Sequence, residues 1–185
     1  MLNRKEAYEL LTKNLRTENL VKHSLAVEAI MQAMAKKLGE DDELWTLTGL
    51  LHDLDFTETR NTPERHGLVT ETILKEAGVC DEIIQAIKSH NAEALGIQRC
   101  DPFHFALTCA ENLTGLIVAT ALVQPDKKVA QVKTSSVVKR MKEKGFARSV
   151  SRDGILLCER IGMPLDEFVA VSLEAMGSIA GELGL

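Results

Sequence analysis

The chain has 185 residues, a formal net charge of −5 and 45% hydrophobic residues, which fits one globular domain over residues 1–185. The negative charge argues against a general nucleic-acid binder, because such proteins usually carry a basic surface. Aromatic residues make up 4% and proline occurs four times, so the composition favours helices over strands. We therefore expect an all-α protein.

The cysteines and the apolar segments bear on the cellular location of the protein. No two cysteines form a CxxC pair, which predicts reduced thiols in an intracellular protein. The first residues lack the apolar core of a signal peptide, and we find no charge-free apolar run of about 18 residues. The sequence thus predicts a cytoplasmic protein that does not contact a membrane.

The first three predicted helices carry a histidine and a histidine–aspartate pair. Helices are expected over 3–15, over 18–38 and from Asp41 or Asp42 to His52, and the apolar stripe of the second extends back to His23. The third helix is apolar up to His52 and Asp53, two groups that are costly to bury without partners. A metal ion is the simplest partner for both groups.

The next two predicted helices each add an inward histidine. Thr62 and Pro63 predict a helix start, and His66 falls on its buried stripe with Val69, Ile73 and Ala77. Asp81 is expected to cap the following helix, where His90 lies in the last turn of the inner face. Taken singly, each histidine is also explained by packing or by the helix dipole.

A very apolar helix is predicted from Asp101 to about Val123, and it contains Glu111. A carboxylate in such a run either belongs to a functional site or pairs with a buried base. After Pro125 the chain becomes basic up to Arg152, and further helices are expected over 135–144, 151–162 and 164–176. The basic residues form either a solvated helix face or a clamp for an anionic substrate, the candidates being Lys139, Arg140, Arg148 and Arg152.

Taken together, the histidines form a recognisable order. The series His23, His52-Asp53, Glu111 resembles the H…HD…D signature of the HD-domain phosphohydrolases, and the likeness covers about residues 21–123. His66 and His90 resemble the additional ligands of the dinuclear members. The segment 110–119 and the basic last third are similar to a bacterial branch of predicted HD hydrolases.

This resemblance implies a compact helical core over 18–123 with a helical extension over 124–185. It implies one or two divalent ions (Mn, Fe, Zn, Co or Mg), the first held by His23, His52, Asp53 and Glu111, and the second by His66 and His90 with Asp53 as bridge. Asp53 would act in catalysis. Asp55, two residues past the motif, is a further catalytic candidate as a hydrogen-bond acceptor or water positioner, or it is an ordinary aspartate at a helix end or turn. The implied reaction is hydrolysis of a phosphomonoester or phosphodiester, in the first instance of a nucleotide, by metal-activated water.

Two residues depart from the family pattern: Glu111 stands where an aspartate is usual, and Asn91 stands where several dinuclear members have a second histidine. Three alternatives stay open. The chain can be a non-catalytic regulatory module that binds metal or nucleotide, a di-iron oxygenase on the same scaffold, or a helical bundle whose histidines only pack. Homo-oligomerisation is also left open.

Overall fold

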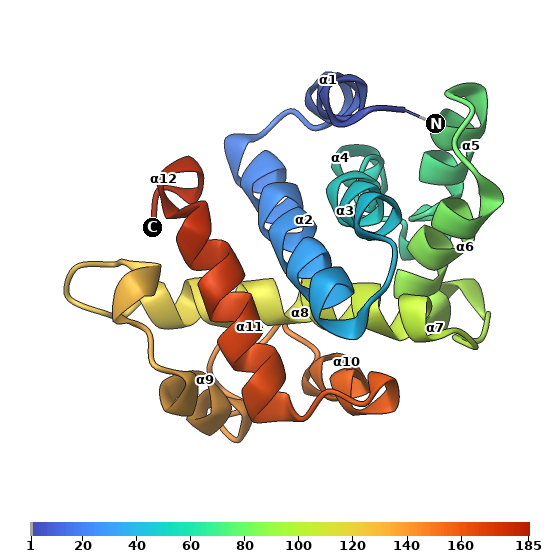
Figure 1. Cartoon of the computed structure of the whole chain (residues 1–185). Coiled ribbons are helices and arrows are strands. Elements are labelled where there is room, and N and C mark those ends of the chain that lie inside the picture. The colour runs from blue at the N-terminus through green and yellow to red at the C-terminus, as the bar shows by residue number, and fades with distance from the viewer. Residues whose placement is uncertain (1) are drawn as a thin grey trace.

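The computed structural model describes residues 2–185, and all regular elements within that range are helices, so the all-α prediction is confirmed (Figure 1). The longer helices are α1 (Arg4–Asn14), α2 (Glu18–Leu38), α3 (Asp42–Leu51), α5 (Leu68–Glu76), α6 (Asp81–His90), α8 (Pro102–Leu122), α9 (Thr134–Met141) and α11 (Leu165–Ser178). Short helices connect them: α4 (Phe56–Thr59), η1 (Pro63–Arg65), α7 (Ala92–Leu95), η2 (Val129–Gln131), α10 (Arg152–Leu156), η3 (Leu157–Ile161) and α12 (Ala180–Leu183).

Helix α8 is the centre of the fold, and α2 and α11 cross it side by side (Figure 1). Its contacts with α6 on one side and with α9, α10 and η3 on the other connect the two halves of the chain. By length and composition α8 could cross a membrane, with a mean hydropathy of 1.5, but 67% of that apolar window is buried inside the protein. This burial is what a core helix requires, because its apolar side chains pack on all sides.

Helix starts follow the expected capping chemistry at four places. Asn3, Asp41, Asp101 and Ser151 each accept a hydrogen bond from a backbone N–H in the first turn. Two predicted caps are wrong. Asp81 is the first helical residue of α6 and Cys80 precedes it as N-cap. The helix predicted over 135–144, with Ser135 or Ser136 as its cap, is α9, which begins at Thr134 with Lys133 as N-cap.

The predicted helix that carries His66 is interrupted. Pro63 starts only a 3-10 turn, His66 is extended, and Gly67 has a φ of 90° before α5 begins at Leu68. This break shifts the helical phase, so the buried residues of α5 are Thr70 and Leu74 and not the predicted stripe. A positive φ is easily adopted by glycine, which explains why the chain can turn here.

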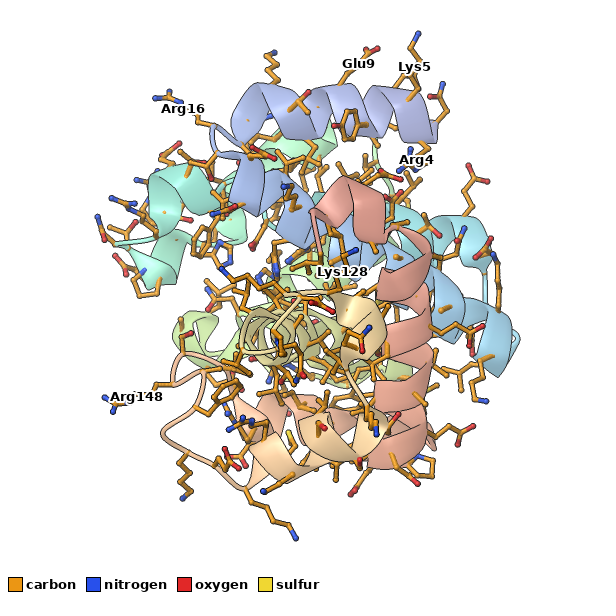
Figure 2. All side chains as sticks on the ribbon, turned by 90° about the vertical axis from the view of Figure 1, so that its left-hand side faces the viewer. Arg4, Lys5, Glu9, Arg16, Lys128 and Arg148 are labelled. Atoms are coloured by element: carbon orange, nitrogen blue, oxygen red, sulfur yellow. The ribbon has the colours of Figure 1, made fainter. Side chains whose placement is uncertain are left out.

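The first helix is tied to the core by an ion pair. Arg4 points from α1 toward the body of the protein, whereas Lys5 and Glu9 point away from it (Figure 2). The Arg4 guanidinium donates two hydrogen bonds, of 2.7 and 2.9 Å, to the buried carboxylate of Glu28 on α2. A bidentate pair of this kind fixes orientation as well as distance.

Candidate metal centre

Asp53 lies at the centre of four histidines. Its Oδ2 is 3.8 Å from Nε2 of His23 and 3.6 Å from Nε2 of His52. Its Oδ1 is 3.3 Å from Nε2 of His66 and 3.6 Å from Nε2 of His90. The two carboxylate oxygens thus face different histidine pairs.

These residues form two groups that can each hold a metal ion. One consists of His23, His52 and Asp53, and the other of Asp53, His66 and His90. The Nε2 atoms are 3.2 Å apart in the first pair and 2.8 Å apart in the second. Ligands about 2.1 Å from one ion at neighbouring octahedral positions are about 3.0 Å apart, so both spacings fit a shared ion.

The histidines are oriented by their other ring nitrogen. Nδ1 of His52 is 2.8 Å from the Gly49 carbonyl oxygen, and Nδ1 of His90 contacts the Ile87 carbonyl oxygen. A carbonyl can only accept, so in both rings Nδ1 carries the proton. The lone pair of the neutral ring therefore lies on Nε2, the atom that faces Asp53.

His23 and His66 are also oriented through Nδ1, in their case by side chains and not by backbone carbonyls. Nδ1 of His23 is 3.1 Å from the Thr114 hydroxyl, which itself donates to the Glu111 carbonyl at 2.6 Å and so accepts from the ring. Nδ1 of His66 is 2.7 Å from Oδ1 of Asp55. All four rings direct Nε2 toward Asp53. Metal-binding histidines are usually oriented in the same way, by a hydrogen bond from the ring nitrogen that does not face the metal.

The close approach of α2 and α3 brings His23 and His52 together. A Cβ at Gly49 would lie 2.9 Å from the Glu28 Cα and from the Val27 carbonyl oxygen, so only glycine fits. The Gly49 carbonyl is also the acceptor for His52. One residue therefore sets both the helix spacing and the orientation of the ring.

Burial and neighbouring charges set the protonation of the cluster. Burial lowers the pKa of His52 to about 3 and also lowers the pKa of His23. Burial opposes the charged form of His66 too, but its hydrogen bonds to Asp53 and Asp55 outweigh this and raise its pKa to about 10. The four histidines come from α2, the end of α3, the turn before α5 and α6, and they surround a carboxylate that is only 5% exposed, beside the fully buried His52.

Glu111 belongs to neither group. Burial raises the pKa of its carboxyl to about 7, and Oε2 accepts a 3.2 Å hydrogen bond from the Asn112 amide. Its ligation of a metal ion stays a prediction. His104, on the same helix, also lies outside both groups.

Asn91 has a role that its sequence position did not indicate. Its amide nitrogen donates to the carbonyl oxygens of Pro63 at 2.7 Å and of His66 at 3.0 Å. Asn91 therefore fixes the turn that carries His66, next to the helix end that carries His90.

The basic residues of the extension have mostly local partners. Arg140 pairs with Glu143 and lies over the Phe146 ring at 4.2 Å, and Arg152 donates to backbone carbonyls of the segment 146–150. Arg148 extends into solvent at the edge of the molecule (Figure 2). Lys139 is exposed on α9. A substrate-binding role for these four residues stays a prediction.

Several residues of the centre were missed from the sequence. Thr114 lies three residues after Glu111, but a threonine in an apolar helix gives no sign of a distant partner. The backbone N–H groups of Gly67 and Thr70 donate to Oδ2 of Asp55 at 2.8 and 2.9 Å, and backbone donors have no sequence signature. Gly49 could be recognised only as a glycine inside a helix, which usually has a packing reason.

Comparison with known proteins places this centre in a family. The HD domain model matches residues 20–122, more than half of the chain. This range contains every histidine and carboxylate of the two groups. No solved structure matches the chain.

Curated relatives match over different lengths. The tRNA (cytidine(56)-2'-O)-methyltransferase of Thermoplasma volcanium is 29% identical over 168 residues, which cover 86% of this chain and 48% of that protein. Ribonuclease Y of Desulfotalea psychrophila is 33% identical over 76 residues, covering 41% of this chain and 15% of the ribonuclease. Ribonuclease Y of Nitratidesulfovibrio vulgaris is 34% identical over 77 residues, with shares of 42% and 15%. The chain spans about half the length of the methyltransferase and a small part of the ribonucleases.

Proposed function

Because the chain belongs to the HD-domain family, we propose that it is a metal-dependent phosphohydrolase that cleaves a phosphomonoester or phosphodiester bond of a nucleotide. The observation that carries this proposal is the convergence of four Nε2 atoms on the two oxygens of Asp53. We further propose two ions with Asp53 as the bridge. Mn²⁺, Fe²⁺, Zn²⁺ and Co²⁺ accept mixed imidazole and carboxylate ligands, and Mg²⁺, which prefers oxygen ligands, is the remaining candidate.

The residues of this chain divide the work between them. His23 and His52 would hold one ion and His66 and His90 the other, with Asp53 shared. Ions held by these residues would lower the pKa of a bound water, which could then act as the nucleophile, and would offset the negative charge of the phosphoryl oxygens. Asp55 keeps the proton of His66 on Nδ1 and is a positioning residue in this scheme.

The names of the related proteins are the only information that they give about a substrate. Ribonuclease Y is named as a nuclease that acts on RNA, whose linkages are phosphodiesters, and this name supports a phosphodiester as a candidate substrate class for this chain. The net charge of −5 speaks against a large nucleic-acid surface here, so we propose a nucleotide-sized substrate. A cytoplasmic location and the absence of a membrane partner remain predictions.

Turnover of model esters tests the proposal. The protein, reconstituted with Mn²⁺, is assayed with p-nitrophenyl phosphate, bis-p-nitrophenyl phosphate and a panel of nucleotides, beside His52→Ala and Asp53→Ala. We expect metal-dependent hydrolysis that both substitutions abolish. Full turnover in either variant would contradict the assignment. Metal binding without turnover of any ester would favour a regulatory module, and a mixed-valent iron signal would favour an oxygenase.

A further inference from the structure

A cavity of about 620 Å³ opens beside His23, away from the histidines of the second group. It lies between α2, α8, the segment 147–150 and residues 183–185. Its volume falls in the range of pockets for small organic ligands, about 300–1,000 Å³. His23 is 27% exposed at the side chain, so this is a side from which a ligand can reach the candidate metal centre.

The cavity has an apolar wall and a polar end. Val118, Leu122, Val150 and Leu183 supply the apolar wall. Lys22, Asn19 and Ser149 supply side-chain donors. Such a pocket suits a ligand with an apolar ring system and a small number of polar or charged groups.

Lys22 is the cation of this cavity. Its Nζ is 2.7 Å from Glu18, but the Lys22 side chain is 29% exposed and that of Glu18 is 79% exposed. An ion pair with so exposed a partner contributes little and is readily exchanged for another anion. Lys22 is thus a cation that lines the same cavity as His23, a residue of the first candidate metal group.

The segment opposite Lys22 is held in place by specific contacts. Ala147 adopts a positive φ of 43°, which is uncommon for a residue with a side chain. Arg152 donates to its carbonyl at 2.7 Å and to that of Val150 at 2.9 Å. A Cβ at Gly115 would lie 2.9 Å from Cγ2 of Val150, so the glycine lets this wall rest on α8. The wall is a built feature and not a loose loop.

We propose that this cavity binds a nucleotide that carries a second phosphate, with its base and ribose against the apolar wall and that second phosphate on Lys22. The assignment rests on the proposed function, because it places the scissile ester at the His23 side of the cavity. An ion held by His23 and its partners would bind one phosphate, and the Lys22 ammonium, which lines the same cavity, would bind a second phosphate of the same nucleotide. A ligand with a single phosphate leaves Lys22 paired with Glu18.

Calorimetric titration of the full-length protein loaded with Mn²⁺ tests the cavity. The probes are adenosine 5′-monophosphate and adenosine 3′,5′-bisphosphate, and chromatography after each run shows that the probe is intact. We expect the wild type to bind the bisphosphate about tenfold more tightly, the difference that one charge-assisted contact provides. Lys22→Ala removes this preference. Lys75→Ala keeps it, since Lys75 also pairs with the glutamate four residues before it but lies outside the cavity.

A second variant fills the cavity. Ala119→Trp weakens binding of both probes at least tenfold, while metal content and the thermal transition show that the protein is folded and loaded. Equal affinity of the wild type for the two probes, no binding of either, or an unchanged preference in Lys22→Ala would overturn the proposal. The readout does not depend on turnover. If the preference holds and no ester is hydrolysed, the hydrolase proposal fails and the binding site stands.

Discussion

The carboxylate of Asp55 holds the ring of His66, with 2.7 Å between Oδ1 and Nδ1. The other oxygen accepts the backbone N–H groups of Gly67 and Thr70, so Asp55 also fixes the turn that follows His66. The aspartate side chain is fully buried. Because both carboxylate oxygens of Asp55 accept hydrogen bonds, the carboxylate cannot rotate freely, and it therefore fixes the orientation of the His66 ring.

Asp55→Asn tests this support. The amide has one acceptor oxygen instead of two, so it cannot serve both the ring and the backbone donors. We expect the affinity of the His66–His90 group for metal to fall about 10- to 100-fold, and the free energy of unfolding to fall by about 1–3 kcal/mol. Metal titration and urea unfolding measure both effects. Asp81→Asn, at an exposed position of α6, is the control; an equal loss there would contradict the role of Asp55.

Thr114→Val removes the hydroxyl that accepts from His23 without changing the side-chain shape. The Nδ1–H of His23 then lacks a partner, and the affinity of the His23–His52 group for metal should fall about tenfold. Thr114→Ser should restore it. Thr120→Val is the matched control, because Thr120 is buried on the same helix and its hydroxyl donates a hydrogen bond only to the Leu116 carbonyl. Equal metal affinity in the two valine variants would show that Thr114 does not position His23.

Gly49→Ala tests the helix spacing. The added methyl meets backbone atoms of α2 at 2.9 Å, which cannot move aside without separating the helices. We expect a loss of about 1–3 kcal/mol in the free energy of unfolding, as for overpacked cores, and weaker metal binding at His23 and His52. Gly177→Ala is the control, since a Cβ there meets nothing within 4 Å. In α11 it should stabilise the protein by about 0.5–1 kcal/mol.

The buried cysteines give a prediction about pH. Burial raises the pKa of Cys158 to about 11 and that of Cys109 well above its usual value. The pKa of the Cys158 thiol is therefore higher in the folded chain than its value of 9.0 in the unfolded chain. The contribution of this difference to the free energy of unfolding is fully present below pH 9.0 and is lost as the pH rises toward 11, because the unfolded chain then loses the proton more readily than the folded chain. Urea midpoints should fall over that range. At pH 8 iodoacetamide should label the exposed Cys100 and spare both buried thiols until the protein unfolds; rapid labelling of Cys109 in the folded state would contradict the packing of α8.

The sequence allowed prediction of most helices and of the histidine cluster. Apolar periodicity identified α2, which has a long, regular buried face, and the long apolar run after Asp101 identified α8. The periodicity predicted the wrong buried face around His66. There Gly67 adopts a left-handed backbone conformation and interrupts the helix, so the residues of α5 that face the core are not those expected from one continuous helix. The short helices α4 and α7 span only about one turn, too few residues for a periodic pattern to show.

The parts of the site that escaped prediction depend on distant partners. Thr114 meets His23 across 91 positions of sequence, and Asn91 supports a turn 25 positions earlier. The hydrogen bonds of Arg152 to the backbone carbonyls of Ala147 and Val150 were also not indicated by the sequence, and its binding of a substrate stays a prediction. Lys22 was overlooked because a single lysine beside a histidine has no distinctive pattern, and only the fold places it in a cavity.

The most direct test of the central claim is the metal content of the protein purified without chelator, with Asp53→Ala measured in parallel. If Asp53 joins two ions, elemental analysis of the wild type should give about two equivalents of a divalent metal, as in two-metal hydrolytic sites. The variant should lose both, because each group contains this carboxylate. Equal metal content in the two proteins, or none in either after incubation with Mn²⁺ and Fe²⁺, would contradict the account.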